Sequence, residues 1–124
     1  MNTTKLDTLR REFQAKLQEN EMCEEKLHAE RRSLEKCQNQ IGEIFPQVLR
    51  YLDETQSELW SKNANEDMRE LGMITEQACN NFAKVRHALE DELDNIEHQR
   101  RTLANEKEQI EAEYKKSITQ LEEK

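Results

Sequence analysis

Glycine and proline are almost absent from this chain of 124 residues, which contains two glycines and one proline. Both residue types interrupt helices and build tight turns, so their scarcity leaves little material for the many turns of a β-rich or α/β fold. Aromatic residues are also sparse, at 5%. The common residues are Glu, Lys, Gln, Arg, Leu and Ala, which favour helix. The composition therefore predicts an all-α protein and argues against an enzyme-like α/β fold.

Hydrophobic residues make up only 34% of the chain, whereas 37% is charged. That is too little apolar material for a multi-layer core, but it is enough for a thin seam between helices. Disorder is the competing interpretation, because low hydrophobicity with a net charge of −8 is also typical of unstructured chains. The apolar periodicity described below favours helices over disorder.

Acidic residues outnumber basic ones, 27 Asp and Glu against 19 Lys and Arg, and the two signs are interleaved along the chain. Without a basic stripe, nucleic acid and anionic membranes are not expected as partners. No apolar run approaches the length that spans a membrane, and the first residues lack the apolar segment of a signal peptide. We therefore expect a soluble protein that is made and first kept in the cytoplasm, without membrane insertion.

Apolar residues recur every seven positions in both halves of the chain. Two neighbouring rows in each half predict one helix over about residues 4–62 and a second over about residues 66–122. The rows of the first helix are Leu6, Phe13, Asn20, Leu27, Leu34, Ile41, Val48 and Thr55, with Leu9, Leu17, Cys23, Cys37, Ile44, Leu52 and Leu59. Those of the second are Met68, Thr75, Phe82, Leu89, Ile96, Leu103, Ile110 and Ser117, with Leu71, Ala78, Val85, Leu93, Tyr114 and Leu121.

The best turn candidate lies at the midpoint of the chain, near residues 61–66. Asn63 followed three residues later by Glu66 resembles a capping box that would begin the second helix. Two arms of equal length joined there predict an antiparallel two-helix hairpin with long coiled-coil-like arms, forming a single domain over residues 1–124. Pro46 is predicted to bend the first helix without ending it, because the helical apolar spacing continues on both sides.

The register of this hairpin closes the half next to the turn with apolar pairs, whereas the open end places polar residues, including Gln99 and Glu106, at seam positions. Helices depend on packing an apolar face for most of their stability. We therefore expect residues 5–30 and 98–122 to fray or to bind a partner. The register sets Leu59 opposite Met68, Phe45 opposite Phe82, Leu27 near Arg100 and Asn20 near Lys107.

Partner binding is accordingly predicted mainly at the open end, where the alternative role of the same apolar residues is ordinary hairpin core. Trp60, the only Trp, stands just before the turn. It either covers the bend or serves as an exposed anchor, since Trp is favoured in binding hot spots. The predicted partner-binding residues are Phe13, Leu17, Leu27, Trp60, Leu103, Ile110, Tyr114 and Leu121.

Catalytic and metal-binding patterns are incomplete. Glu25 and His28 form an ExxH pair on one helical face, but neither of the other two histidines has a carboxylate at that spacing, and a di-iron bundle needs both pairs. Three cysteines without a CxxC pair indicate reduced thiols, at least partly buried, rather than a disulfide framework. We expect no enzymatic activity, no metal and no cofactor.

The spacing from Phe45 to Trp60, followed by Asp67-Met68-Arg69, resembles a pattern in the WXG-type (Esx-like) helical proteins of type VII secretion. With the arm from residue 89 to 124, rich in Glu, Gln, Lys and Arg, the likeness narrows to the small α-helical proteins associated with LXG toxins. The resemblance covers nearly the whole chain, although Ser61 and Lys62 follow Trp60, so the glycine of the WXG motif is missing.

This resemblance implies a targeting factor or chaperone. Together with a sister small helical protein, it would bind the N-terminal helical region of an LXG toxin for delivery to the secretion machine, and it could leave the cell with that complex. The export signal of such systems, an aromatic residue with an acid four residues later, is absent, so a partner is expected to supply it. A structural coiled-coil homo-oligomer or scaffold is the competing interpretation, and a homodimer remains open.

Overall fold

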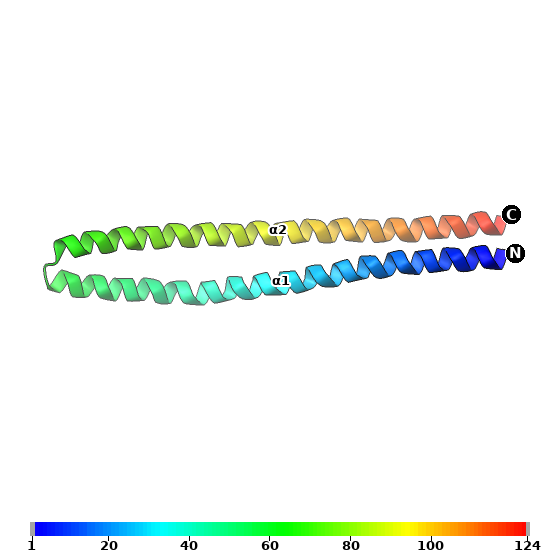
Figure 1. Cartoon of the computed structure of the whole chain (residues 1–124). Helices are drawn as coiled ribbons and strands as arrows, with labels where there is room; N and C mark the ends of the chain where they lie inside the picture. The colour runs from blue at the N-terminus through cyan, green and yellow to red at the C-terminus, as the bar shows by residue number, and fades with distance from the viewer. Residues whose placement is uncertain (1, 124) are drawn as a thin grey trace. The chain divides into compact units, whose positions relative to one another are not determined.

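The computed structural model describes residues 2–123 and contains two helices, α1 over Asn2–Ser61 and α2 over Asn65–Glu123 (Figure 1). The helices pack against each other in antiparallel directions, which confirms the predicted all-α hairpin. Each boundary lies within two residues of the prediction. In the described part of the chain, neither helix has a stretch long and apolar enough to cross a membrane.

Residues 62–64 form the turn, and their hydrogen bonds to carbonyl groups near the end of α1 fix its conformation. Asn63 has a left-handed backbone with φ of 55°. The amide of Ala64 donates to the carbonyl of Leu59 at 3.1 Å, and the amide of Asn63 donates to that of Trp60 at 3.1 Å. This pair of hydrogen bonds is a Schellman motif, which satisfies carbonyls that a helix end leaves unpaired.

The predicted capping box at Asn63 and Glu66 is therefore wrong. The first intrahelical hydrogen bond of α2 runs from the amide of Met68 to the carbonyl of Ala64 at 3.0 Å, so Ala64 occupies the cap position. Asn63 serves the preceding helix because Asn tolerates the left-handed conformation better than most residues. Glu66 lies in the first turn of α2, where a negative charge is favourable beside the positive end of the helix dipole.

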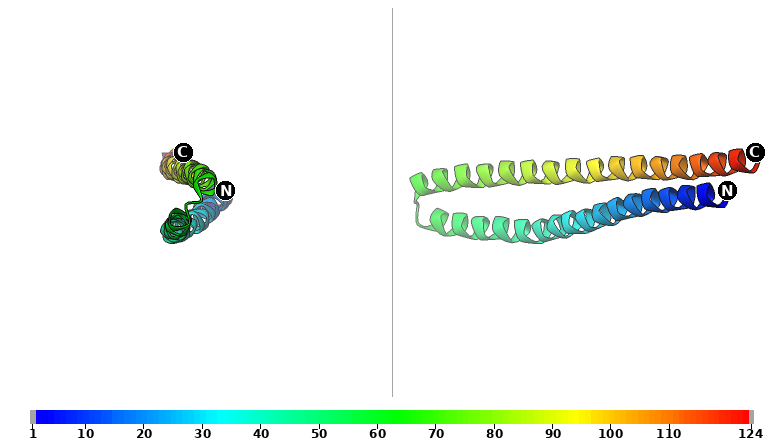
Figure 2. Two further views of the ribbon diagram at one scale, coloured as in Figure 1. Left: turned by 90° about the vertical axis from the view of Figure 1, so that its left-hand side faces the viewer. Right: turned by 45° about the vertical axis from the view of Figure 1, so that its right-hand side comes forward.

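Pro46 lies inside α1, and the helix continues through it, as Figure 2 shows by an unbroken ribbon. Proline removes one backbone donor and crowds the preceding turn, yet the flanking residues keep their helical conformation. The chain therefore does not turn at Pro46.

The packing of the two helices falls into two units. The terminal unit comprises the described residues up to Arg31 and those from Asp94 onward, and the turn unit comprises residues 32–93. Each unit contains a segment of α1 and a segment of α2, and each has its own stacked aromatic pair.

In the terminal unit, the rings of Phe13 and Tyr114 stack with centroids 4.0 Å apart and planes 7° from parallel. Leu27, Ile96 and Ile110 are buried, and Ile96 keeps only 3% of its surface exposed. These residues come from both helices, so this part of the hairpin is closed by side chains that face each other across the seam.

The polar seam positions predicted at the open end are confirmed in part, and the seam closes around them. Asn20, 4% exposed, donates a hydrogen bond of 3.0 Å from its side-chain amide to the carbonyl of Leu103 on the opposite helix. Arg100 and Lys107 are partly buried, which is consistent with long aliphatic stems covering the seam while the charges stay near water. Gln99 and Glu106, predicted to interrupt the seam, are exposed.

In the turn unit, the predicted pair of Phe45 and Phe82 is confirmed, with ring centroids 3.7 Å apart and planes 8° from parallel. Leu71 is the buried aliphatic residue of this unit. Thr75, at a seam position, satisfies its hydroxyl by donating to the carbonyl of Leu71 at 2.9 Å. The Thr75 hydroxyl therefore needs no partner from the other helix.

The cysteines differ from the prediction in one respect. Cys23, Cys37 and Cys79 are free thiols, but all three are exposed rather than partly buried. The apolar seven-residue rows drift around the helix, and the true seam passes through Glu24 and Gln38, both partly buried, instead of Cys23 and Cys37.

Candidate docking groove

An open apolar groove lies on one side of the turn unit. Its floor is the stacked pair of Phe45 and Phe82, each contributed by one helix. The groove encloses about 350 Å³. Its other lining residues are Ile41, Ile44 and Val48 from α1, and Ala78, Asn81 and Val85 from α2.

The walls of this groove are exposed to solvent. Ile44 is 56% exposed and Val85 is 45% exposed, although both belong to rows that the sequence places at the seam. That placement is wrong for them, because two helices can cover only a narrow stripe on each other's surface. This part of the second apolar row on each helix therefore stays open.

The groove extends toward the turn through two further apolar residues. Tyr51 lies seven residues after Ile44 on α1, and Ile74 lies seven residues before Asn81 on α2, so each continues a wall by two helical turns. Tyr51 is 68% exposed and Ile74 is 53% exposed. Sequence reasoning missed both, although their seven-residue spacing from the groove residues was a visible signal.

Exposed apolar side chains are unevenly divided between the two units. In the terminal unit, within the described residues, Met22 alone is a strongly exposed large apolar residue. A contiguous exposed apolar surface commonly marks a site of interaction with another protein. The corresponding residues of the turn unit are Ile44, Val48, Tyr51, Trp60, Met73, Ile74 and Val85.

The turn end of the groove is acidic. Seven-residue spacing continues the α1 wall from Tyr51 to Glu58 and the α2 wall from Ile74 back to Asp67. Both carboxylates are exposed, and neither is within 4 Å of a cationic group among residues 2–123. Their charges are available to a ligand that enters the groove.

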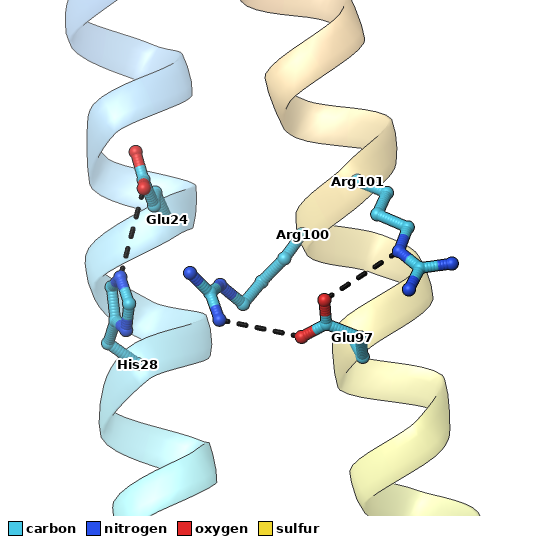
Figure 3. A network of polar contacts seen from close by, with 5 residues as sticks. All are labelled: Glu24, His28, Glu97, Arg100 and Arg101. Carbon is cyan, nitrogen blue, oxygen red and sulfur yellow. Dashed lines mark hydrogen bonds and ion pairs between the residues drawn. The ribbon is translucent and has the colours of Figure 1, made fainter.

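A polar groove in the terminal unit has the opposite character. Glu97 pairs with Arg100 at 3.4 Å and with Arg101 at 3.7 Å, and Figure 3 shows the Arg100 side chain extending toward α1. Glu97 and Arg101 are four residues apart, so this ion pair lies along the surface of α2. Charges that already neutralise each other on one helix leave little electrostatic attraction for an added ligand.

His28, which belongs to the incomplete ExxH pattern, lies beside a carboxylate other than that of Glu25. His28 lies 3.7 Å from Glu24, one turn away, instead of sharing a site with Glu25 (Figure 3). No group of three or more metal-ligating side chains comes together anywhere in residues 2–123. The histidine and its carboxylate are a half-exposed pair on the surface of α1.

Most of the predicted partner-binding residues are used to close the terminal unit. Phe13 stacks on Tyr114, and the others are buried or partly buried between the helices. Trp60 differs, since it is 71% exposed and does not cover the bend. A role for Trp60 as an anchor stays a prediction. The partly covered residues are Leu17, Leu103 and Leu121, and the buried ones are Leu27 and Ile110.

The comparisons with known proteins add no relative. No family model, no curated protein and no solved structure matches the chain. The assignment of function therefore depends on the groove and on the sequence pattern.

Proposed function

We propose that this chain is a non-enzymatic adaptor that binds a helical region of another protein. The observation that carries the proposal is the open apolar groove of the turn unit, formed by Ile44 and Val48 on one helix and Val85 on the other. A groove between two helices is suited to an amphipathic helix, whose apolar residues at every third or fourth position match its length.

The partner we propose is the N-terminal helical region of an LXG-type toxin, bound together with a sister small helical protein for export by type VII secretion. Support for this identity is the pattern from Phe45 through Trp60 to Arg69. That segment includes part of the groove, so the residues that carry the resemblance and those that expose apolar surface overlap. In this role the chain would cover the toxin's apolar helices before secretion.

Co-purification tests this function directly. The chain is expressed with the N-terminal helical region of a candidate LXG toxin, with and without a sister small helical protein, and the mixture is separated by size-exclusion chromatography. We expect a complex that survives at micromolar concentration. Elution of the chain alone in both mixtures would contradict the adaptor role.

The alternative, a homo-oligomeric scaffold, has a different signature. Light scattering of the isolated chain over a range of concentrations would then show a stable oligomer that does not dissociate on dilution. An adaptor whose groove awaits another protein is expected to remain monomeric, or to associate only weakly, in the same measurement.

A further inference from the structure

Both walls of the docking groove change in chemical character in the same direction along the hairpin. On α1, the row at seven-residue spacing runs from Ile44 through Tyr51 to Glu58. On α2, the matching row runs from Ile74 back to Asp67. Residues seven apart lie two turns apart on the same face, so both walls change from apolar to acidic as they approach the turn.

In the next rows outward, neutral polar residues are followed by acids toward the turn. Gln47 is followed at seven residues by Glu54, and Gln77 is preceded at seven residues by Glu70. Lys84 is the cation of the outer α2 row and lies away from the turn end. The groove is therefore bordered near the turn by four carboxylates, all exposed.

None of these four carboxylates is neutralised by an ion pair in the described structure. The nearest cations along the chain are Arg50, one helical turn before Glu54, Lys62, four residues after Glu58 in the turn, and Arg69, next to Glu70. None of the three forms an ion pair with these carboxylates in the described structure. Exposed like charges repel each other, and a ligand that brings the opposite charge relieves that repulsion.

We propose that the docking groove receives one amphipathic helix whose apolar stripe is flanked by Lys or Arg at the end that lies beside the turn. The apolar stripe of this helix contacts Ile44, Val48 and Val85, and its basic flanks lie beside Glu58 and Asp67. This inference rests on the proposed function and adds the charge and the orientation of the bound helix.

A second copy of this chain fits the groove less well. The turn unit carries twelve Asp and Glu against seven Lys and Arg, so a copy placed on the groove brings further acids to the same surface. Like charges brought together across an interface oppose association, whereas a basic helix is attracted. The charge of the turn unit thus selects a different, basic partner.

The length of the groove sets the length of the probe. The α1 wall spans residues 41–58 from its first apolar residue to its acidic end, which is about 26 Å at about 1.5 Å per residue. A helix of about 15–18 residues covers this distance. Two synthetic peptides of that length serve as probes, with the same Leu stripe, one flanked by Lys and the other by Glu.

Binding of each fluorescently labelled peptide to the full chain is measured by anisotropy at low and at high salt. We expect the Lys-flanked peptide to bind at least about tenfold more tightly than the Glu-flanked peptide at low salt, with the difference shrinking as salt screens the flanks. Equal affinity of the two peptides at low salt would overturn the proposed charge of the occupant.

Matched variants locate the site. Ile44→Asp is expected to weaken binding of the Lys-flanked peptide about tenfold or more, whereas Met73→Asp, equally exposed in the same unit but outside the groove lining, leaves it within about twofold. If Ile44→Asp loses helicity, the milder double variant Ile44→Ser with Val85→Ser replaces it. Equal effects of the groove and control variants would overturn the site.

Reversing the charges gives the most specific test. The double variant Glu58→Lys with Asp67→Lys is expected to reverse the preference, so that the Glu-flanked peptide binds more tightly than the Lys-flanked peptide. The control Glu21→Lys with Glu25→Lys makes the same charge change on exposed residues of the terminal unit and is expected to keep the original preference. An unchanged preference in the groove variant would overturn the orientation.

Two further outcomes also decide against the proposal. Failure of both peptides to bind a folded chain would show that the groove takes no isolated helix. Dimerisation that Ile44→Asp abolishes and Met73→Asp does not would show that a second copy occupies the groove.

The proposed function fails independently of this inference. Binding of the toxin region without any effect of Ile44→Asp would retain the adaptor role and reject the groove. Binding of the Lys-flanked peptide without binding of the toxin region would retain the groove and reject the toxin as its partner.

Discussion

The terminal unit and the turn unit are built from the same two helices, but they differ in how many large apolar side chains they leave exposed. In the terminal unit, Leu27, Ile96 and Ile110 are buried between the helices, and a buried Asn20 bridges them. In the turn unit, Leu71 is buried while Ile44 and several other large apolar side chains are exposed. The number of apolar residues in a unit therefore does not determine how many of them are buried between the helices.

The position of each apolar residue around its helix explains the difference. Full burial of an Ile or Leu contributes about 1.5–3 kcal/mol, whereas a side chain left half in water contributes far less. Ile44 and Val85 lie one row outside the seam, so they stabilise the hairpin little and leave apolar surface available for a partner. The residues at the seam thus stabilise the fold, and the apolar residues one row outside the seam are available for binding.

Replacing matched isoleucines in the two units should give the largest contrast. Ile96→Ala removes a buried side chain and leaves a gap between the helices, so we expect a loss of about 2–3 kcal/mol in unfolding free energy. Ile74→Ala removes an exposed side chain and is expected to cost less than about 1 kcal/mol. Urea denaturation followed by circular dichroism measures both, and equal losses would remove the distinction between the units.

Asn63 should be the most sensitive position of the turn. Its φ of 55° is unfavourable for β-branched residues, so Asn63→Val is expected to lower stability by about 1–2 kcal/mol. Glycine adopts this conformation without strain, and Asn63→Gly should be neutral or slightly stabilising. The same urea series compares the two variants. A neutral Asn63→Val would mean that the Schellman motif does not close the hairpin.

The glycines of the turn unit should be replaceable at a gain. A Cβ atom added at Gly42 or Gly72 meets nothing within 4 Å, and both residues are exposed within helices. Gly42→Ala and Gly72→Ala should therefore each raise the unfolding free energy by up to about 1 kcal/mol through helix propensity. Thermal unfolding checks this result. Destabilisation would reveal a need for glycine in the turn unit that its surroundings do not show.

The ion pairs of the terminal unit should matter least. Glu97 pairs with Arg100 and Arg101, but its side chain is half exposed and the pairs lie on one helix. Glu97→Gln is expected to change the free energy of unfolding by less than about 0.5 kcal/mol. At low salt the change is expected to stay within the small range that is usual for exposed ion pairs. A loss of several kcal/mol in thermal unfolding would make this network, rather than the buried seam, the support of the terminal unit.

Much of the hairpin could be predicted from sequence because two signals were strong. Seven-residue apolar spacing located both helices, and the midpoint cluster around Asn63 located the turn within a few residues. The register followed from these, and the stacking of Phe45 on Phe82 confirms it. Pro46 was correctly kept inside a helix, because the apolar spacing on both sides outweighed the lost hydrogen bond.

The groove could not be found in the same way, since its recognition needs knowledge of which apolar row faces the other helix. Leu71 and Ile74 are only three residues apart on α2, yet Leu71 is buried in the seam and Ile74 is exposed. Polar residues at the seam are a second source of error, because a sequence does not show that the side-chain amide of Asn20 donates to the carbonyl of Leu103 and so fits inside the seam. Asn63 is a third, because Asn is favourable at both kinds of helix end and its sequence position does not tell which helix it caps.

Hydrogen exchange with and without the Lys-flanked peptide is the most direct measurement of the central claim, that the turn unit and not the terminal unit is the docking surface. We expect amides of residues 41–55 and 71–88 to exchange at least about fivefold more slowly when the peptide is bound. Amides of residues 6–27 and 96–118 are expected to be protected in both states. Peptide-dependent protection confined to residues 6–27 and 96–118 would contradict the account and place the docking surface at the open end.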